Sequence, residues 1–270
     1  SLFHRSAYVN TYVLNLELNR LNKEKEAVSK EIADLEASKA AKDSQGQAAY
    51  KAILPHLPQG WPQVLDWKES GLSQKLQQQK TAFTATHNQA VQEYEADKAA
   101  YETAKEEYNR LNGELKALED QLATAEDQLE VLQGLEANLR ELQENGASQE
   151  EIDAAQAELD NKVAEYGADS SQLETKITQL QGQVGDAEQA VADAKKAMDS
   201  AKGEMDQAEA AKNEAKKALD NLNKVIQIAG EIAGLDNSIA QKSTAMSQLT
   251  ASIADVKDKI AQFKPYMDNR

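Results

Sequence analysis

The sequence holds 270 residues, of which 5% are aromatic and only 4 are proline, a composition typical of long helices rather than of a packed globule. Cysteine is absent, which excludes disulfides, thiol nucleophiles and Cys-based zinc sites and suits an oxidising environment. The formal net charge of −16 disfavours binding to nucleic acid or to anionic membranes, both of which attract clustered Lys and Arg.

The first helix is predicted over residues 1–44, because apolar side chains recur there at steps of three and four residues, the spacing of a coiled-coil seam. Residues 2–16 are apolar on more than one side of this helix, so we expect more than one partner to cover them. The chain begins with Ser1 rather than Met, which we interpret as a processed or trimmed N-terminus. The seam comprises Leu14, Leu18, Leu21, Lys25, Val28, Ile32 and Leu35, and the candidates for an assembly interface are Leu2, Phe3, Tyr8, Val9, Tyr12, Val13 and Leu16.

An elbow is predicted after the first helix. Turn residues at positions 44–46 predict that the helix stops near Asp43, and the prolines and glycine within residues 55–62 exclude one continuous helix beyond that point. The elbow contains both tryptophans of the chain, Trp61 and Trp67. We interpret it as a local cap that packs over the end of a helix bundle, and the alternative is a binding surface for another subunit or a ligand.

A second and much longer helix is predicted over residues 75–144, because this stretch lacks proline and keeps the coiled-coil spacing. At about 1.5 Å per residue, such a helix is on the order of 100 Å long. The phase of the pattern shifts once near Gly134, which predicts a local loosening of the supercoil. Tyrosines repeat every seven residues, and we interpret them as packing at the edge of the core with their hydroxyls in water, with a partner-binding stripe as the alternative. They are Tyr94, Tyr101 and Tyr108.

A reversal of the chain is predicted over residues 145–170, where turn residues stop the long helix and a short helix follows. The short helix opens with a capping box, in which a Ser is followed three residues later by a Glu. It is predicted to end at Tyr166 and Gly167, after which residues 169–171 cap the next helix. The stop and the capping box consist of Asn145, Gly146, Ser148 and Glu151.

The last long helix is predicted over residues 171–235, with an alanine-rich middle that lets a partner approach closely and with Lys212 as its only polar seam position. The spacing changes within residues 230–237, which predicts a kink in a continuing helix, with a turn as the alternative. A C-terminal helix over residues 236–270 follows, and Pro265 is predicted to end it. Its seam supplies the remaining assembly candidates, Ile253, Val256, Ile260 and Phe263.

Together these segments predict an all-α fold, a long antiparallel coiled-coil helical hairpin with paired N- and C-terminal helices and a short helical tip. The helices on the two sides of the tip have similar lengths and return alongside each other, which leaves the two terminal helices to pair. A lone helix pair buries only half of each seam, so we expect helices from other subunits at the base. The predicted segments are 1–44, 45–74, 75–144, 145–170, 171–235 and 236–270.

The negative charge is concentrated in the middle of the chain. Residues 1–44 and 45–74 each carry equal numbers of acids and bases, and residues 236–270 carry 4 acids and 5 bases. Residues 75–235 carry 33 acids and 16 bases, a net charge of −17. We therefore expect the neutral terminal helices to form a base and the acidic hairpin to face solvent as an arm.

No pattern typical of an enzyme or a cofactor site occurs in the sequence. Phosphate-binding glycine loops, zinc-protease motifs, nucleophile elbows and EF-hand loops are absent. His4, His56 and His87 are far apart, and paired acids along a helix lack the converging loop that binds Ca²⁺. We expect no catalytic residue, no metal and no cofactor. No apolar stretch reaches the roughly 20 residues that span a bilayer, so we expect a soluble chain without membrane insertion.

The leading functional hypothesis is a non-catalytic structural protein that self-assembles into a homo-oligomer or polymer through its neutral terminal helices, with the acidic hairpin projecting. This division of labour resembles flagellin-like and other helical filament subunits, in which paired terminal helices build the core. The resemblance is one of architecture, without a shared motif. The lack of cysteine favours an extracellular or cell-surface location, and the tip and the elbow are candidate sites for another protein.

Two alternatives stay open at this point. One is a secreted helical pore-forming toxin or a protein similar to type III secretion translocators, which have a similar content of Ala, Gln and Lys. The sequence lacks the hydrophobic tongue that such a protein would insert into a membrane. The other is an intracellular coiled-coil tether that holds two partners about 100 Å apart.

Overall fold

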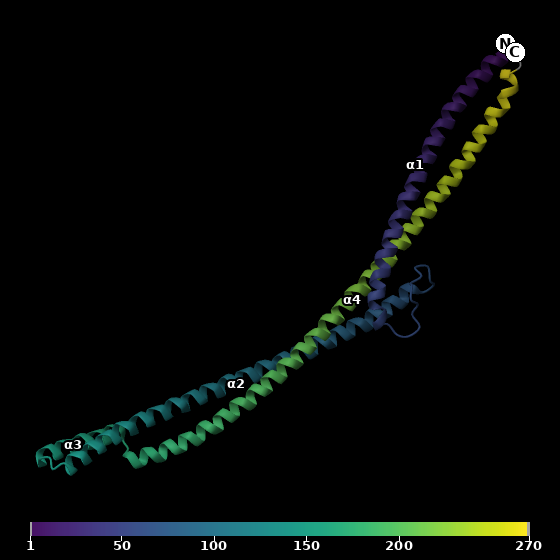
Figure 1. The fold of residues 1–270 in the computed structure, drawn as a ribbon. Coiled ribbons are helices and arrows are strands. Elements are labelled where there is room, and N and C mark those ends of the chain that lie inside the picture. Colours follow the sequence, from purple (N-terminus) through teal and green to yellow (C-terminus); the bar gives the residue numbers. More distant parts are fainter. Residues whose placement is uncertain (1, 269–270) are drawn as a thin grey trace. The chain divides into compact units, whose positions relative to one another are not determined.

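The computed structural model describes residues 2–268, except for the side chains of Phe3 and Asp268. Every regular element within these residues is a helix, and the two long helices pack against each other, so the predicted all-α helical hairpin is confirmed. The elements are α1 (Leu2–Ile53), the short 3-10 helix η1 (Leu54–His56), α2 (Leu72–Glu144), α3 (Gln149–Tyr166) and α4 (Ser170–Asp268), labelled in Figure 1.

The chain divides into two compact units, and both α2 and α4 contribute to each of them. The terminal unit comprises residues 1–89 and 213–270, and the acidic unit comprises residues 90–212. Of the 46 acids and 30 bases of the chain, the terminal unit holds 16 acids and 19 bases, and the acidic unit holds 30 acids and 11 bases. The net charges are therefore +3 and −19, a sharper separation than sequence segments alone provide.

In the terminal unit, α1 runs beside the last part of α4, and the pairing expected of the N- and C-terminal helices is present (Figure 1). In the seam between them, Leu21 is only 6% exposed and packs with Ile253 and Val256. Charged side chains flank this seam and neutralise one another across it. The ion pairs are Lys39–Asp236 at 2.6 Å, Lys42–Glu231 at 2.9 Å and Lys242–Glu31 at 2.6 Å.

The prediction that the first helix stops near Asp43 is wrong, because α1 continues to Ile53. Gly46 is a helical residue, and its role is to leave room for an aromatic ring. A Cβ atom at this position would lie 2.5 Å from ring atoms of Trp67 and 2.8 Å from Ile228. The glycine therefore permits close packing on the helix surface rather than a turn.

The alternative of a turn within residues 230–237 is wrong, because α4 is one helix of 99 residues. Residues 171–235 and 236–270 consequently belong to the same element. Asp236 suggested a break from its sequence, but its carboxylate pairs with the ammonium group of Lys39 on the neighbouring helix. The predicted continuation of the helix through these residues is thus confirmed.

Pro265 lies inside α4, which continues to Asp268, so the prediction that this proline ends the helix is wrong. A proline removes one backbone hydrogen bond and crowds the turn that precedes it. The residues that follow it still donate to earlier carbonyls, and a last partial turn can therefore form.

In the acidic unit, α2 and α4 pair in an unbroken antiparallel register. Lys212 lies over the ring of Tyr94, and the Ser170 hydroxyl donates a hydrogen bond to Glu136. The two contacts are separated by 42 residues on each helix, so the helices do not slip relative to each other between these points. Large apolar side chains are buried along the seam, among them Leu132, Leu173 and Leu180.

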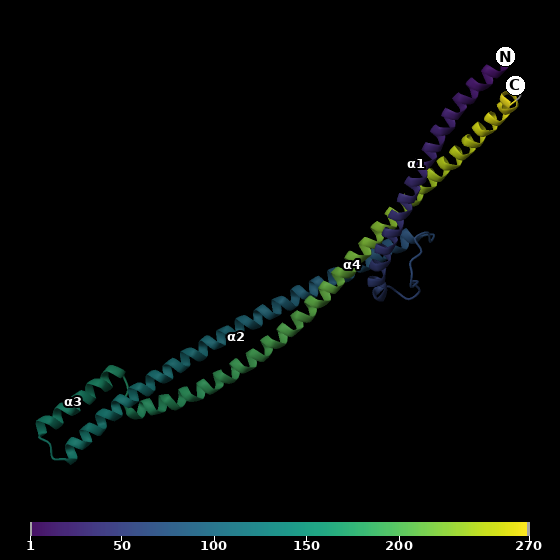
Figure 2. The ribbon, with the colours of Figure 1, turned by 45° about the horizontal axis from the view of Figure 1, so that its top comes forward.

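The tip of the acidic unit is made by α3, which folds back from the end of α2 before α4 begins (Figure 2). Ser148 is the N-cap of α3 and accepts a hydrogen bond from the backbone N–H of Glu151 at 3.2 Å, as predicted. Gly167 ends the helix in the left-handed conformation, with φ of 70°. The reciprocal capping box lies at α4, where Asp169 and Gln172 each accept a hydrogen bond from the backbone N–H of the other.

Candidate assembly surface

An apolar surface lies on the side of α1 that faces away from α4. Its residues are exposed, although they are as large as those of a core: Leu2 is 86%, Val9 is 62% and Tyr12 is 66% exposed. Opposite them, Ala7 is 2% exposed in the seam with α4. We call this surface the outer face, and it consists of Leu2, Val9, Tyr12, Val13 and Leu16.

The outer face is a continuous stripe, because its members share one side of the helix. Leu2, Val9 and Leu16 are seven residues apart and so lie above one another after two helical turns. Tyr12 and Val13 fill the spaces between them on either side of this line. A stripe of this kind on a second side of a paired helix is typical of a helix that packs against two neighbours.

The other predicted assembly candidates behave differently. Ile253 and Val256 are buried in the seam with α1, and Ile260 packs against the same cluster. Phe263 is half-buried, and Tyr8 is 40% exposed. The side chain of Phe3 lies outside the described residues. The structure therefore separates the α4 candidates, used within the chain, from the outer face of α1.

Charge is sparse around the outer face. Residues 2–16 contain Arg5 and no acid, and the first carboxylate of the chain belongs to Glu17. Arg20 donates to Glu17 at 3.0 Å and to Glu24 at 2.6 Å. The hydrogen bonding of Arg20 to Glu17 holds the pKa of the Glu17 carboxyl below its usual value. The apolar stripe thus ends where a fully paired set of charges begins.

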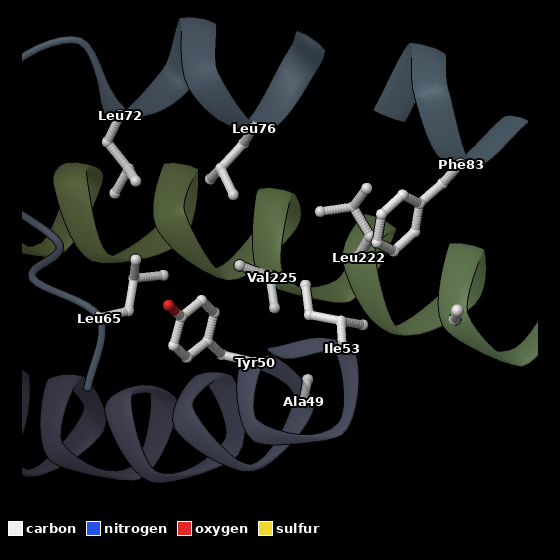
Figure 3. Close-up of a cluster of buried hydrophobic side chains, with 10 residues drawn as sticks. Ala49, Tyr50, Ile53, Leu65, Leu72, Leu76, Phe83, Leu222 and Val225 are labelled. Carbon is white, nitrogen blue, oxygen red and sulfur yellow. The ribbon is translucent and has the colours of Figure 1, made fainter. Parts of the chain in front are cut away.

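The elbow loop packs over a cluster of ten buried residues in the terminal unit, which we call the hub (Figure 3). Tyr50 is its largest fully buried member, and its hydroxyl donates a hydrogen bond to the carbonyl of Pro62. Burial raises the pKa of the Tyr50 hydroxyl, and the carboxylate of Glu69 adds to this effect. The hub consists of Ala49, Tyr50, Ile53, Leu65, Leu72, Leu76, Phe83, Ala218, Leu222 and Val225.

Side chains of α1 hold the loop in place. The Gln47 amide nitrogen donates to the carbonyl of Leu65 at 2.8 Å, and its oxygen accepts from the Leu65 N–H at 3.0 Å. The indole N–H of Trp67 donates to Asp43 at 2.6 Å. Sequence reasoning missed these anchors, although the spacing of Asp43 and Gln47 by one helical turn is a signal that was present.

The two elbow tryptophans are half-buried and pack against the hub. Trp61 lies with its ring centroid 6.4 Å from that of Tyr50, and Trp67 covers Gly46. Both rings are thus engaged within the chain. These contacts favour the interpretation of the elbow as a local cap.

A groove of about 580 Å³ lies between the start of α2 and α4 in the terminal unit. Apolar side chains line it, among them Trp67, Leu72 and Ile226, and Glu69 is its single charged lining residue. The groove therefore offers packing surface.

The tip candidates lie together at the end of the acidic unit. Asn145, Gly146, Ser148 and Glu151 are all exposed, and Gly146 has a φ of 68° that suits the turn after α2. Within residues 2–268, no group of three or more His, Asp or Glu side chains is placed to hold a metal ion. Among the described helices, none has the length and apolar character needed to cross a bilayer.

No protein-family model matches the chain, and a search of curated proteins finds no match. Its function must therefore be inferred from its own surfaces and charge.

Proposed function

We propose that this chain is a non-catalytic structural coiled-coil subunit that self-assembles through its terminal helices into an oligomer, filament or surface appendage. The observation that carries this proposal is the outer face of α1, where five large apolar side chains are each more than half exposed. Contiguous exposed patches of this kind mark protein–protein contact sites in soluble proteins. Here the patch lies on a helix whose other side already packs against α4, so we expect another protein surface to bury it.

The distribution of charge supports assembly through the terminal unit. Copies that met through the acidic unit, with its net charge of −19, would repel one another. The terminal unit carries a net charge of +3, and its charges beside the seam are paired across α1 and α4. The acidic unit is left as the part that keeps the assembly soluble or meets another protein, with the tip as the candidate contact.

The mass of the protein in solution tests this proposal. Light scattering over a range of protein concentrations should give masses above the 29.6 kDa of one chain. Added salt should strengthen the association, because it screens the repulsion between acidic units and leaves apolar contacts intact. Negative-stain electron microscopy would then distinguish closed oligomers from filaments. A mass of one chain at every concentration and salt concentration would contradict the proposal.

We further propose that the chain acts outside the cell or at its surface. The complete absence of cysteine supports this location, because a chain without thiols folds equally well in oxidising surroundings. Labelling of intact source cells with a membrane-impermeant amine reagent should modify exposed lysines of this protein. Protection of every lysine until the cells are lysed would contradict the location.

A further inference from the structure

Two leucines of the outer face of α1 are placed symmetrically about Val9. Leu2 and Leu16 lie seven residues before and after it, so a bulky aliphatic residue stands at each end of the stripe. Arg5 and Tyr12 lie on the same side of the helix, four residues before and three residues after Val9. A surface with this arrangement can pair with a reversed copy of itself.

A reversed pairing also suits the charges. In an antiparallel pair centred on Val9, Leu2 of each helix meets Leu16 of the other, and the Arg5 guanidinium reaches the Tyr12 ring, whose face attracts a cation. In a parallel pair, the two Arg5 side chains would stand at the same level along the helices, and neither would face a Tyr12 ring. Like charges brought directly opposite each other destabilise a helix pair. The antiparallel arrangement therefore has the better electrostatic complementarity.

We propose that the outer face of α1 binds the same face of a second copy of this chain, antiparallel, with the two Val9 residues at the two-fold axis. This inference rests on the proposed self-assembly and specifies its first contact. The closed two-fold symmetry is the commonest arrangement of protein homodimers.

The outer side of α4 is a poorer candidate for the same contact. Ala254, Asp258 and Ala261 lie on its side away from α1, and all three are exposed. A face of alanines and a carboxylate buries little apolar area. The two copies of α1 consequently lie in the middle of the dimer, with one α4 on each outer side.

The size of the face sets the expected strength of the dimer. Five side chains of this kind supply on the order of 500 Å² of apolar surface per copy, within the range of the largest patch on a typical monomer. Specific, stable interfaces bury at least about 1,200 Å² in total, and two such faces supply only about 1,000 Å², so this contact lies in the range of weak, transient interfaces. The dimer should therefore form in a concentration-dependent manner, and larger assemblies should need further contacts.

Single-cysteine variants test the orientation directly, because the natural chain contains no cysteine. Leu2→Cys and Leu16→Cys are prepared separately, and each is treated with a short bifunctional maleimide, alone and in a 1:1 mixture of the two. Ala254→Cys on the outer side of α4 is the matched control. The antiparallel dimer predicts that the mixture crosslinks several-fold more than either variant alone, with little product from the control. Val9→Cys should crosslink by itself.

The outcomes separate this inference from the proposed function. Crosslinking of Leu2→Cys alone and of Leu16→Cys alone, as strong as in the mixture, would show a parallel pair and overturn the antiparallel contact. Association of the unmodified chain by light scattering, without crosslinking at any of the three outer-face positions, would overturn the contact and leave self-assembly standing. A single-chain mass at all concentrations would overturn both.

Discussion

The ammonium nitrogen of Lys212 lies 4.0 Å from the centroid of the Tyr94 ring, across the seam between α2 and α4. A lysine at a seam position gives up part of its hydration, and a cation loses free energy unless a partner replaces that water. The face of an aromatic ring is such a partner. The pair thus accounts for the only polar seam position predicted within residues 171–235, and it shows that Tyr94, the first tyrosine of the seven-residue repeat, contacts a residue of the same chain.

We expect Lys212 and Tyr94 to be energetically coupled. A double-mutant cycle with Tyr94→Leu and Lys212→Met should give a coupling of about 0.5–1 kcal/mol in the free energy of unfolding, the value typical of exposed cation–π pairs. Urea unfolding followed by circular dichroism supplies the four values. A cycle with Tyr101→Leu and Lys212→Met is the control, and its coupling should be close to zero. Equal coupling in both cycles would contradict the assigned contact.

Replacing Gly46 by alanine should destabilise the terminal unit, although alanine favours helices. The new Cβ atom would lie 2.5 Å from the Trp67 ring, and such overpacking costs about 1–3 kcal/mol. Gly230→Ala is the matched control, because nothing lies within 4 Å of its added Cβ, and it should stabilise the chain by about 0.5–1 kcal/mol. Thermal unfolding with tryptophan fluorescence measures both. An unchanged or stabilised Gly46→Ala protein would show that Trp67 does not pack this closely against Gly46.

Gln47→Leu should loosen the elbow loop. The substitution leaves the N–H and the carbonyl of Leu65 without their partner, and each unpaired buried group costs about 1–3 kcal/mol. We therefore expect faster cleavage within residues 57–71 by a protease of broad specificity, together with a lower unfolding midpoint. Gln45→Leu, at an exposed position two residues earlier, is the control. Equal cleavage rates in the two variants would show that Gln47 does not anchor the loop.

The pairing of α1 with α4 should weaken in acid. Hydrogen bonds from Lys42 and then Gln227 lower the pKa of Glu231 in the folded chain. A carboxylate with a lowered folded pKa contributes stability above its unfolded pKa, and this contribution is lost as the pH falls through the folded value. The unfolding temperature should therefore decrease when the pH is lowered below the usual range of Glu titration. Glu231→Gln and Lys42→Met should each make this decrease with pH shallower. A slope identical to that of the unmodified chain would contradict this contribution.

Heptad spacing was sufficient to predict the hairpin, because the seam residues of each helix recur at the interval that brings them to one side. Leu21 occupies a predicted seam position and is buried there, and Leu132 and Leu180 are buried along the seam between α2 and α4. The tip was predictable for a local reason, since Ser148 and Gly167 act on the backbone within a few residues of themselves.

The errors arose where a distant residue decides the local structure. Gly46 has the residue type of a helix stop, but the ring of Trp67, 21 residues later, packs directly against it within the helix. Asp236 belongs to the residues that left a turn open as an alternative, but it lies inside α4 and pairs with Lys39 of α1. Sequence alone also could not show which assembly candidates are buried within the chain. Ile253, which faces α1, and Val9, which faces solvent, are both apolar, and residue type does not distinguish them.

Self-assembly through the outer face of α1 is tested most directly by the solution mass of one pair of variants. Tyr12→Asp places a charge in the middle of the face, whereas Ala254→Asp places the same charge on the outer side of α4. Both positions are exposed, so neither change should unfold the helix pair, which circular dichroism would verify. We predict that light scattering at high protein concentration finds Tyr12→Asp at the mass of one chain and Ala254→Asp at the larger mass of the unmodified protein. Undiminished association of Tyr12→Asp, or the same loss in both variants, would contradict assembly through this face.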